Sequence, residues 1–172
     1  MIVGNPDVFS IMFDVVDEWN YDTTFNNGLL FMSIDGKIFL SELTTAILNL
    51  ELPQLIENLK NPSENKEIFH MEKNEAFTHI YGLTFPSDWD VSNDYSYDIT
   101  PNEFGDHDCC VFMVSSEDKI RILAASKLQY IKEESTHDLQ DINVAETYIS
   151  NEELEKMVGK LIVLEQQLQE RR

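Results

Sequence analysis

Hydrophobic and polar residues alternate near the start of the chain in a pattern that is typical of a β-strand. In the segment 8–17, VFSIMFDVVD, every second residue from Phe9 to Val15 is large and apolar, while Ser10 and Asp14 lie between them. A period of two places the apolar residues on one face of a strand and the polar residues on the other. We therefore predict a half-buried strand here.

An Asp-Gly pair, Asp35 and Gly36, lies between the apolar runs 29–34 and 37–40. Asp-Gly favours a two-residue turn whose twist fits two antiparallel strands, so we predict a β-hairpin at this point. The next stretch, 41–52, fits a strand or a short helix about equally well, and its pattern leaves both open.

A second hairpin is predicted from the runs CCVFMV (109–114) and KIRILAA (119–125), which flank the polar turn SSED. Alternation along the first run places Cys109 and Cys110 on opposite faces, each followed by apolar residues. A strand that is apolar on both faces is a central strand, where cysteine behaves as a small hydrophobic residue. The segment 141–149, DINVAETYI, is a weaker strand candidate.

Two internal segments have the apolar spacing of helices. Pro53 is predicted to open a helix over 53–61, because a proline at the first helical position gives up no hydrogen bond. The segment 74–82, NEAFTHIYG, is predicted to form another helix that ends at Gly82 as its C-terminal cap.

A C-terminal helix is predicted from the capping box formed by Ser150 and Glu153. Its apolar stripe alternates spacings of three and four: Leu154, Met157, Leu161, Leu164 and Leu168. We favour docking of this stripe inside the molecule, with dimerisation as the alternative, and so expect a monomer or a weak homodimer. Hairpins without crossovers predict an α+β fold with a mainly antiparallel sheet, helices packed on it and a C-terminal helix.

The charge balance is strongly acidic: 12 Lys and Arg residues against 32 Asp and Glu residues give a net charge of −20. Such a field repels nucleic acid and anionic membranes and attracts basic partners, although acidity also keeps a small protein soluble. A hydrophobic content of 42% is sufficient for a core. Without a membrane span, a secretory leader or a disulfide framework, we expect a cytoplasmic protein.

The histidines and cysteines suggest chemistry but complete no known motif. His107 could share a face with Cys109, yet further metal ligands would have to come from distant segments. His137 and Asp138 could form an acid–base pair, but no nucleophile motif accompanies them. The segment 88–99 resembles a calcium loop that lacks the required Gly and Glu. We expect no catalytic residue, no cofactor and no metal.

The segment SDWDVSNDYSYD, residues 87–98, combines aromatic and acidic side chains, and we name it the acidic aromatic loop. Aromatic anchors among charged residues are typical of protein interfaces, although a merely solvated loop is the alternative. The candidate partner-binding residues are Asp88, Trp89, Asp90, Asp94, Tyr95, Tyr97 and Asp98.

Four segments, in this order along the chain, resemble a known protein family: IVGNPDVFSIMFDVVDEWN, NNGLLFMSIDGKIF, SNDYSYDITPNEF and RILAASKLQYIKEESTHDLQDINVAETYISNEEL. They resemble immunity protein family 42, the bacterial partners of polymorphic toxins, from residue 2 to about residue 155. The resemblance implies one domain over 1–172, of which about 156–172 is a variable helical tail. It also implies a non-catalytic protein that binds and neutralises a cognate toxin domain.

An acidic surface would suit a basic toxin such as a nuclease. The alternative is an acidic nucleic-acid mimic that inhibits a DNA- or RNA-binding protein.

Overall fold

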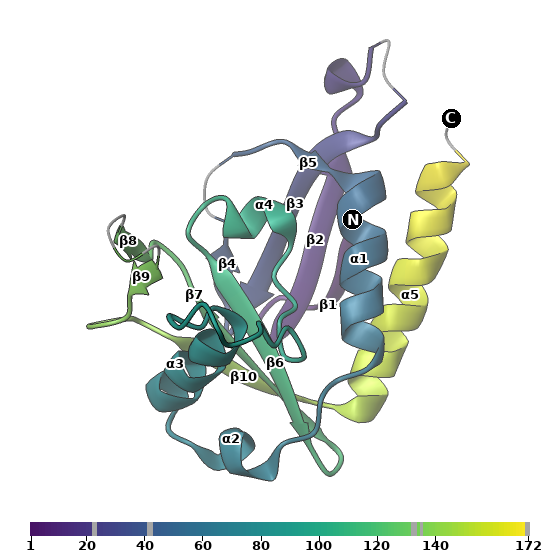
Figure 1. Cartoon of the computed structure of the whole chain (residues 1–172). Coiled ribbons are helices and arrows are strands. Elements are labelled where there is room, and N and C mark those ends of the chain that lie inside the picture. Colours follow the sequence, from purple (N-terminus) through teal and green to yellow (C-terminus); the bar gives the residue numbers. More distant parts are fainter. Residues whose placement is uncertain (22–23, 41–42, 132–133, 135, 171–172) are drawn as a thin grey trace.

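Two antiparallel sheets and a set of helices build the molecule (Figure 1), in a computed structural model that describes residues 1–21, 24–40, 43–131, 134 and 136–170. The first sheet has the order β1-β2-β3-β4, with β5 also paired to β3. Its strands are β1 (Ile2–Asn5), β2 (Phe9–Val15), β3 (Asn27–Ile34), β4 (Lys37–Phe39) and β5 (Ala46–Ile47). The predicted N-terminal strand and the Asp35-Gly36 hairpin are both confirmed, and both turn residues have positive φ.

The second sheet has the order β10-β7-β6, and a separate pair joins β8 to β9. Its strands are β6 (Cys110–Ser116), β7 (Lys119–Ala125) and β10 (Ala145–Ser150); the pair consists of β8 (Gln129–Ile131) and β9 (Thr136–Asp138). The second predicted hairpin is confirmed as β6–β7, and the weaker strand candidate as β10. The fold is α+β, as predicted, with its antiparallel strands divided among separate sheets.

Six helical segments complete the described chain. They are η1 (Asp17–Trp19), α1 (Leu48–Lys60), α2 (Lys66–His70), α3 (Lys73–Thr84), α4 (Asn102–Gly105) and α5 (Asn151–Gln169). Helices α1 and α5 lie side by side on one flank, whereas α2 and α3 lie on the other side of the second sheet (Figure 1). No helix of the described residues is long and apolar enough to cross a membrane.

Strand β6 separates two hydrophobic cores. Cys109, Val111 and Met113 belong to the larger core, which is formed with the first sheet, α1 and α5. Cys110 and Phe112 belong to the smaller core, which is formed with α2 and α3. The prediction of one cysteine on each face of a doubly buried strand is therefore confirmed. The prediction that this strand is central is wrong, because β7 is the middle strand of the sheet and β6 is at its edge, where, among the described residues, only isolated bridges to Glu64 and Asp98 cover it.

The C-terminal helix begins at the predicted capping box, with the Ser150 hydroxyl and the Glu153 carboxylate each accepting from the other's backbone N–H. Four of its five stripe residues are buried, and the helix packs against α1 and β1. Its last buried residue is Leu168, so the segment after residue 155 contributes to the core. The division of the chain into a domain and a variable tail stays a prediction.

Two predicted helix boundaries are wrong. Helix α1 begins at Leu48 rather than at Pro53, because the buried Leu48 and Leu52 extend its apolar face toward the N-terminus despite the proline. Residues 48–52 of the ambiguous stretch are thus helical, whereas 41–42 lie outside the described residues. Helix α3 continues through Gly82 to Thr84, whose hydroxyl is buried and donates to the Ile80 carbonyl.

Arg121 on β7 is 1% exposed and joins α2 to the second sheet. Its Nη1 donates to the carbonyls of Ile68 (3.0 Å), Phe69 (3.0 Å) and Met71 (2.9 Å) at the end of α2. Its Nε donates to Glu146 on β10 at 2.8 Å, and Nη2 bonds the same carboxylate. A buried guanidinium is tolerated only when it is paired and hydrogen-bonded in this way.

We expect Arg121→Met to lower the free energy of unfolding by about 3–5 kcal/mol, because it leaves Glu146 and three carbonyls without their donor. Urea denaturation measures the change. Lys60→Met is the matched control, since it removes a cation from an exposed ion pair with Glu57 and should cost less than about 1 kcal/mol. Equal losses in the two variants would contradict the role of Arg121.

Candidate partner-binding surface

The acidic aromatic loop follows α3 and is attached to the fold through its middle and its C-terminal end. In its middle, the Asn93 side-chain amide donates to the Thr84 carbonyl at 2.8 Å, and the Asp94 N–H donates to the Leu83 carbonyl at 2.9 Å. At its end, the Tyr97 carbonyl accepts from the N–H of Met113 on β6 at 2.8 Å. Residues 93–97 are therefore held between the end of α3 and the edge strand β6.

Aspartates shape the backbone within the loop. The Asp88 carboxylate accepts from the Asp90 N–H at 3.0 Å, and the Asp88 carbonyl accepts from the Val91 N–H at 3.1 Å. The Asp94 carboxylate accepts from both the N–H and the hydroxyl of Ser96. These hydrogen bonds favour the ionised carboxyl and lower the pKa of Asp94.

The candidate residues differ widely in exposure. Trp89 is 94% exposed and Tyr95 is 58% exposed, and the carboxylates of Asp88 and Asp90 lie in solvent. Tyr97 is buried in the smaller core, where its hydroxyl accepts from the Asn65 amide at 3.2 Å. Asp94 and Asp98 are half-buried. The loop thus presents Asp88, Trp89, Asp90 and Tyr95 and uses Tyr97 to anchor itself.

A row of aromatic rings connects the exposed loop to the interior. Tyr95 packs edge-on against Phe85, with ring centroids 6.4 Å apart. The ring centroids of Phe85 and Tyr81 are 5.0 Å apart, and those of Tyr81 and His137 are 5.9 Å apart. Aromatic pairs at these distances stabilise each other beyond their buried area, so the row supports the loop from beneath.

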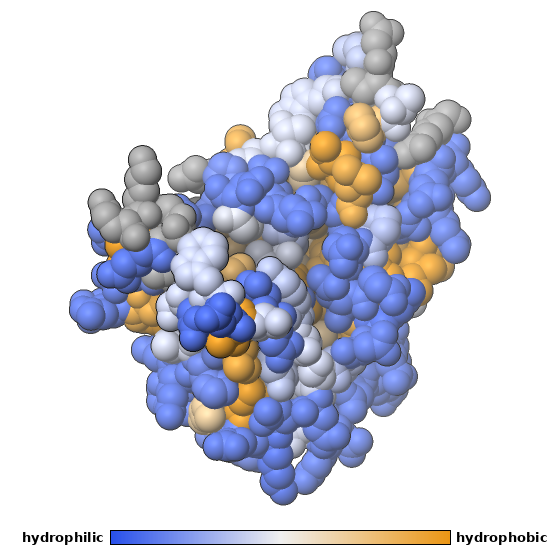
Figure 2. All heavy atoms as spheres, viewed as in Figure 1, coloured by the Kyte–Doolittle hydropathy of each residue, from blue (hydrophilic) through white to orange (hydrophobic). Residues whose placement is uncertain are grey.

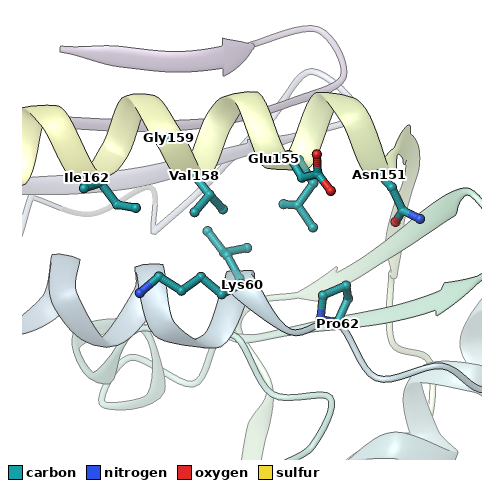
Figure 3. Close-up of a pocket in the computed structure, with 9 residues that line it drawn as sticks. Lys60, Pro62, Asn151, Glu155, Val158, Gly159 and Ile162 are labelled. Carbon is teal, nitrogen blue, oxygen red and sulfur yellow. The ribbon is translucent and has the colours of Figure 1, made fainter.

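Hydrophilic residues cover most of the surface in the view of Figure 2, and hydrophobic residues form separate patches. Next to the loop, a cleft of about 210 Å³ is lined in part by Phe85, Asp88, Trp89 and Glu134. A larger groove of about 530 Å³ lies between α1 and α5 (Figure 3). Its lining residues are Leu59, Lys60, Pro62, Asn151, Leu154, Glu155, Val158, Gly159 and Ile162.

Comparison with known families decides what kind of protein carries this surface. The model of the family Immunity protein 42 matches residues 1–163. The chain belongs to this family. The predicted resemblance is therefore confirmed, and the match extends past residue 155, where the resemblance in sequence ends. Membership makes the chain a toxin-neutralising immunity protein.

The fold of the immunity protein also occurs in a solved structure, CdiI from Burkholderia dolosa AUO158. The two structures superpose with a TM-score of 0.77 at 21% sequence identity, over 95% of this chain and 99% of that chain. At this identity the likeness shows a shared fold. No curated protein matches the immunity protein in sequence.

The two cysteine thiols of the immunity protein are buried. Desolvation raises the pKa of Cys109 to about 12, and it raises the pKa of Cys110 as well, with the charge of Asp98 adding to the effect. A thiol with a raised pKa is a weak nucleophile and a poor metal ligand. Within the described part of the chain, no three His, Cys, Asp or Glu side chains are grouped closely enough to hold a metal ion.

His137 does not pair with its neighbour Asp138 as one sequence interpretation suggests. Its Nε2 lies 2.9 Å from the Asp108 carboxylate, and its Nδ1 lies 2.7 Å from the Tyr81 hydroxyl oxygen. That oxygen also accepts from the His137 backbone N–H at 3.1 Å. These contacts attach β9 to α3 and to the segment before β6. Sequence analysis missed them because the partners are 56 and 29 residues away.

His107 likewise pairs within its own segment rather than with Cys109. Its Nε2 lies 3.2 Å from the carboxylate of Glu103, one turn earlier in the chain. The partner of His107 is thus a residue of the same turn region, four positions earlier in the chain.

Burial raises the pKa of Asp98, although hydrogen bonds from Thr100 oppose the shift. A raised native pKa means that the folded state binds this proton more tightly than the unfolded state. Ionised Asp98 therefore costs stability above its native pKa, and the cost disappears as the pH falls toward the ordinary value of about 3.9.

We accordingly expect Asp98→Asn, which keeps an oxygen acceptor for Thr100, to raise the free energy of unfolding at about pH 7 and to have little effect near pH 4. Urea denaturation at several pH values measures this difference. A variant that loses stability at neutral pH and regains it in acid would show that the ionised carboxylate is stabilising.

Proposed function

We propose that this immunity protein neutralises its cognate toxin domain by binding alone, with the acidic aromatic loop in the contact surface and the cytoplasm as the site of action. One observation carries the proposal: Trp89 is 94% exposed, between two exposed aspartates, on a loop that its residues 93–97 attach to the fold. Burial of this large, solvent-exposed indole against a partner lowers the free energy of the complex.

The order of the loop supports its role as a binding surface. Hydrogen bonds to Leu83, Thr84 and Met113 hold its second half, and Tyr97 anchors it in the smaller core. A partner that binds an ordered loop does not have to freeze it, so more of the contact energy becomes affinity.

The charge supports a basic partner. At −20 the immunity protein would attract a positively charged toxin domain, such as a nuclease, and increase its rate of association. The same field would repel nucleic acids and anionic membranes.

Binding without catalysis agrees with the chemistry of the most reactive side chains. Both thiols are buried with raised pKa values. The His137 imidazole, 16% exposed, is occupied by Asp108 and Tyr81 in a contact that attaches one strand to the fold. Neither arrangement offers an accessible activated nucleophile.

Two loop variants test the proposal with the cognate toxin domain. Changing Asp88 and Asp90 together to Asn should slow association, and the effect should shrink as ionic strength rises. Trp89→Ala should instead accelerate dissociation and cost about 2 kcal/mol or more of binding free energy at any salt concentration. Surface plasmon resonance at two ionic strengths separates the two effects.

The charge-matched control changes Asp17 and Glu18 in η1 to Asn and Gln, which removes the same charge from another exposed segment. The proposed placement is wrong if the folded loop variants bind the toxin domain as the wild type does.

A further inference from the structure

The groove between α1 and α5 is separate from the acidic aromatic loop and differs from it in chemistry. Buried leucines from each helix, Leu59 and Leu154, contribute to its walls. Figure 3 shows the Val158 and Ile162 side chains of α5 directed toward α1, in the space where Lys60 and Pro62 also lie. Its volume of about 530 Å³ lies within the range of about 300–1,000 Å³ that is usual for binding pockets.

We propose that this groove receives large apolar side chains from the same toxin domain that contacts the loop, on a segment that also carries a basic residue. The inference rests on the proposed function and adds a second, apolar contact to it. Apolar side chains that fill a groove between helices are a common mode of protein recognition.

The groove and the loop are joined through one short segment. Pro62 lines the groove, and the hydroxyl of the next residue, Ser63, donates to the Ser96 carbonyl of the loop at 2.9 Å. Two residues further on, the Asn65 amide bonds the hydroxyl of Tyr97. A single partner surface can therefore cover the groove and the loop at once.

Charge next to the groove indicates the chemistry of the partner segment. Lys60 is paired with Glu57 at 3.0 Å, and Lys156 is paired with Glu152 at 2.6 Å. Glu155 lines the groove and is exposed, and it has no ion-pair partner among the described residues. The carboxylate of Glu155 is therefore available to a partner, and a Lys or Arg side chain beside the inserted apolar residues would complement its negative charge.

A second copy of the chain fits this groove less well than a basic partner. Each copy carries a charge of −20, so two copies repel each other. The groove also borders Glu155, which would face a second acidic surface. The charge pattern thus favours a heterologous, basic occupant.

Gly159 gives direct experimental access to the groove. It lines the groove in the middle of α5, and a Cβ added there would meet no atom within 4 Å. Gly159→Trp should therefore fill the groove without disturbing the core. Gly159→Ala keeps the groove open and should raise the melting temperature, because alanine is a better helix former than glycine.

The experiment compares binding of the cognate toxin domain to the wild type, Gly159→Trp, Gly159→Ala and Ile162→Ala. Gln167→Trp is the matched control, since Gln167 is exposed on α5 and does not line the groove. We expect Gly159→Trp to weaken binding by about tenfold or more, mainly through faster dissociation and at high salt as well as low. Ile162→Ala should weaken binding less, while Gly159→Ala and Gln167→Trp should stay within about twofold of the wild type.

Each other result has a separate meaning. If Gly159→Trp and Ile162→Ala bind normally while Trp89→Ala does not, the groove lies outside the interface and the proposed function stands. If Gly159→Trp and Gln167→Trp weaken binding equally, the effect is not specific to the groove and the inference is wrong. If the wild type does not bind the toxin domain, the proposed function fails together with the inference. Sedimentation of the free protein as a dimer that Gly159→Trp dissociates would assign the groove to a second copy instead.

Discussion

Strands β6 and β7 bury both of their faces, and the remaining elements are arranged to cover them. One face needs the first sheet, α1 and α5, and the other needs α2 and α3. Every residue of β6 is buried, so both faces of the strand are covered by other parts of the molecule. Because each face must be covered by different segments, the chain passes from one side of the second sheet to the other, and the connecting segments lie at the surface.

The acidic aromatic loop is one of these connections. It leaves the end of α3, crosses to β6 and delivers Tyr97 to the smaller core. Its second half is held between α3 and β6, whereas the side chains of Trp89 and Tyr95 remain exposed. The segment that joins α1 to α2 makes the opposite crossing and borders the loop through Ser63 and Asn65. The same constraint therefore places the end of the loop, at Ser96 and Tyr97, beside the segment that follows α1 and borders the groove through Pro62.

Local sequence predicts those features that depend on local physics. The alternation around Cys109 and Cys110 predicts their opposite faces, Asp35-Gly36 predicts its hairpin, and Ser150 with Glu153 predicts the start of α5. A helix can begin before Pro53 or continue past Gly82 when tertiary burial outweighs a local boundary signal, and both predicted boundaries are wrong for that reason.

Features that depend on distant partners have no local signal. The bonds from Arg121 to α2 join residues about fifty positions apart, and the partners of His137 come from two other segments. In the candidate surface, the clustering of aromatic and acidic residues identifies the loop, but composition alone does not separate the exposed Trp89 from the buried Tyr97. Only the register between the loop and β6 decides which of them faces the core.

The most direct test follows Trp89 in the complex. The immunity protein has two tryptophans, Trp19 and Trp89, so labelling with 5-fluorotryptophan gives two ¹⁹F resonances, which Trp19→Phe assigns. On addition of unlabelled toxin domain, the account predicts that the Trp89 resonance shifts and loses its sensitivity to the exchange of H₂O for D₂O, because the indole is buried against the partner. A tightly bound toxin domain that leaves the Trp89 resonance unchanged would contradict it.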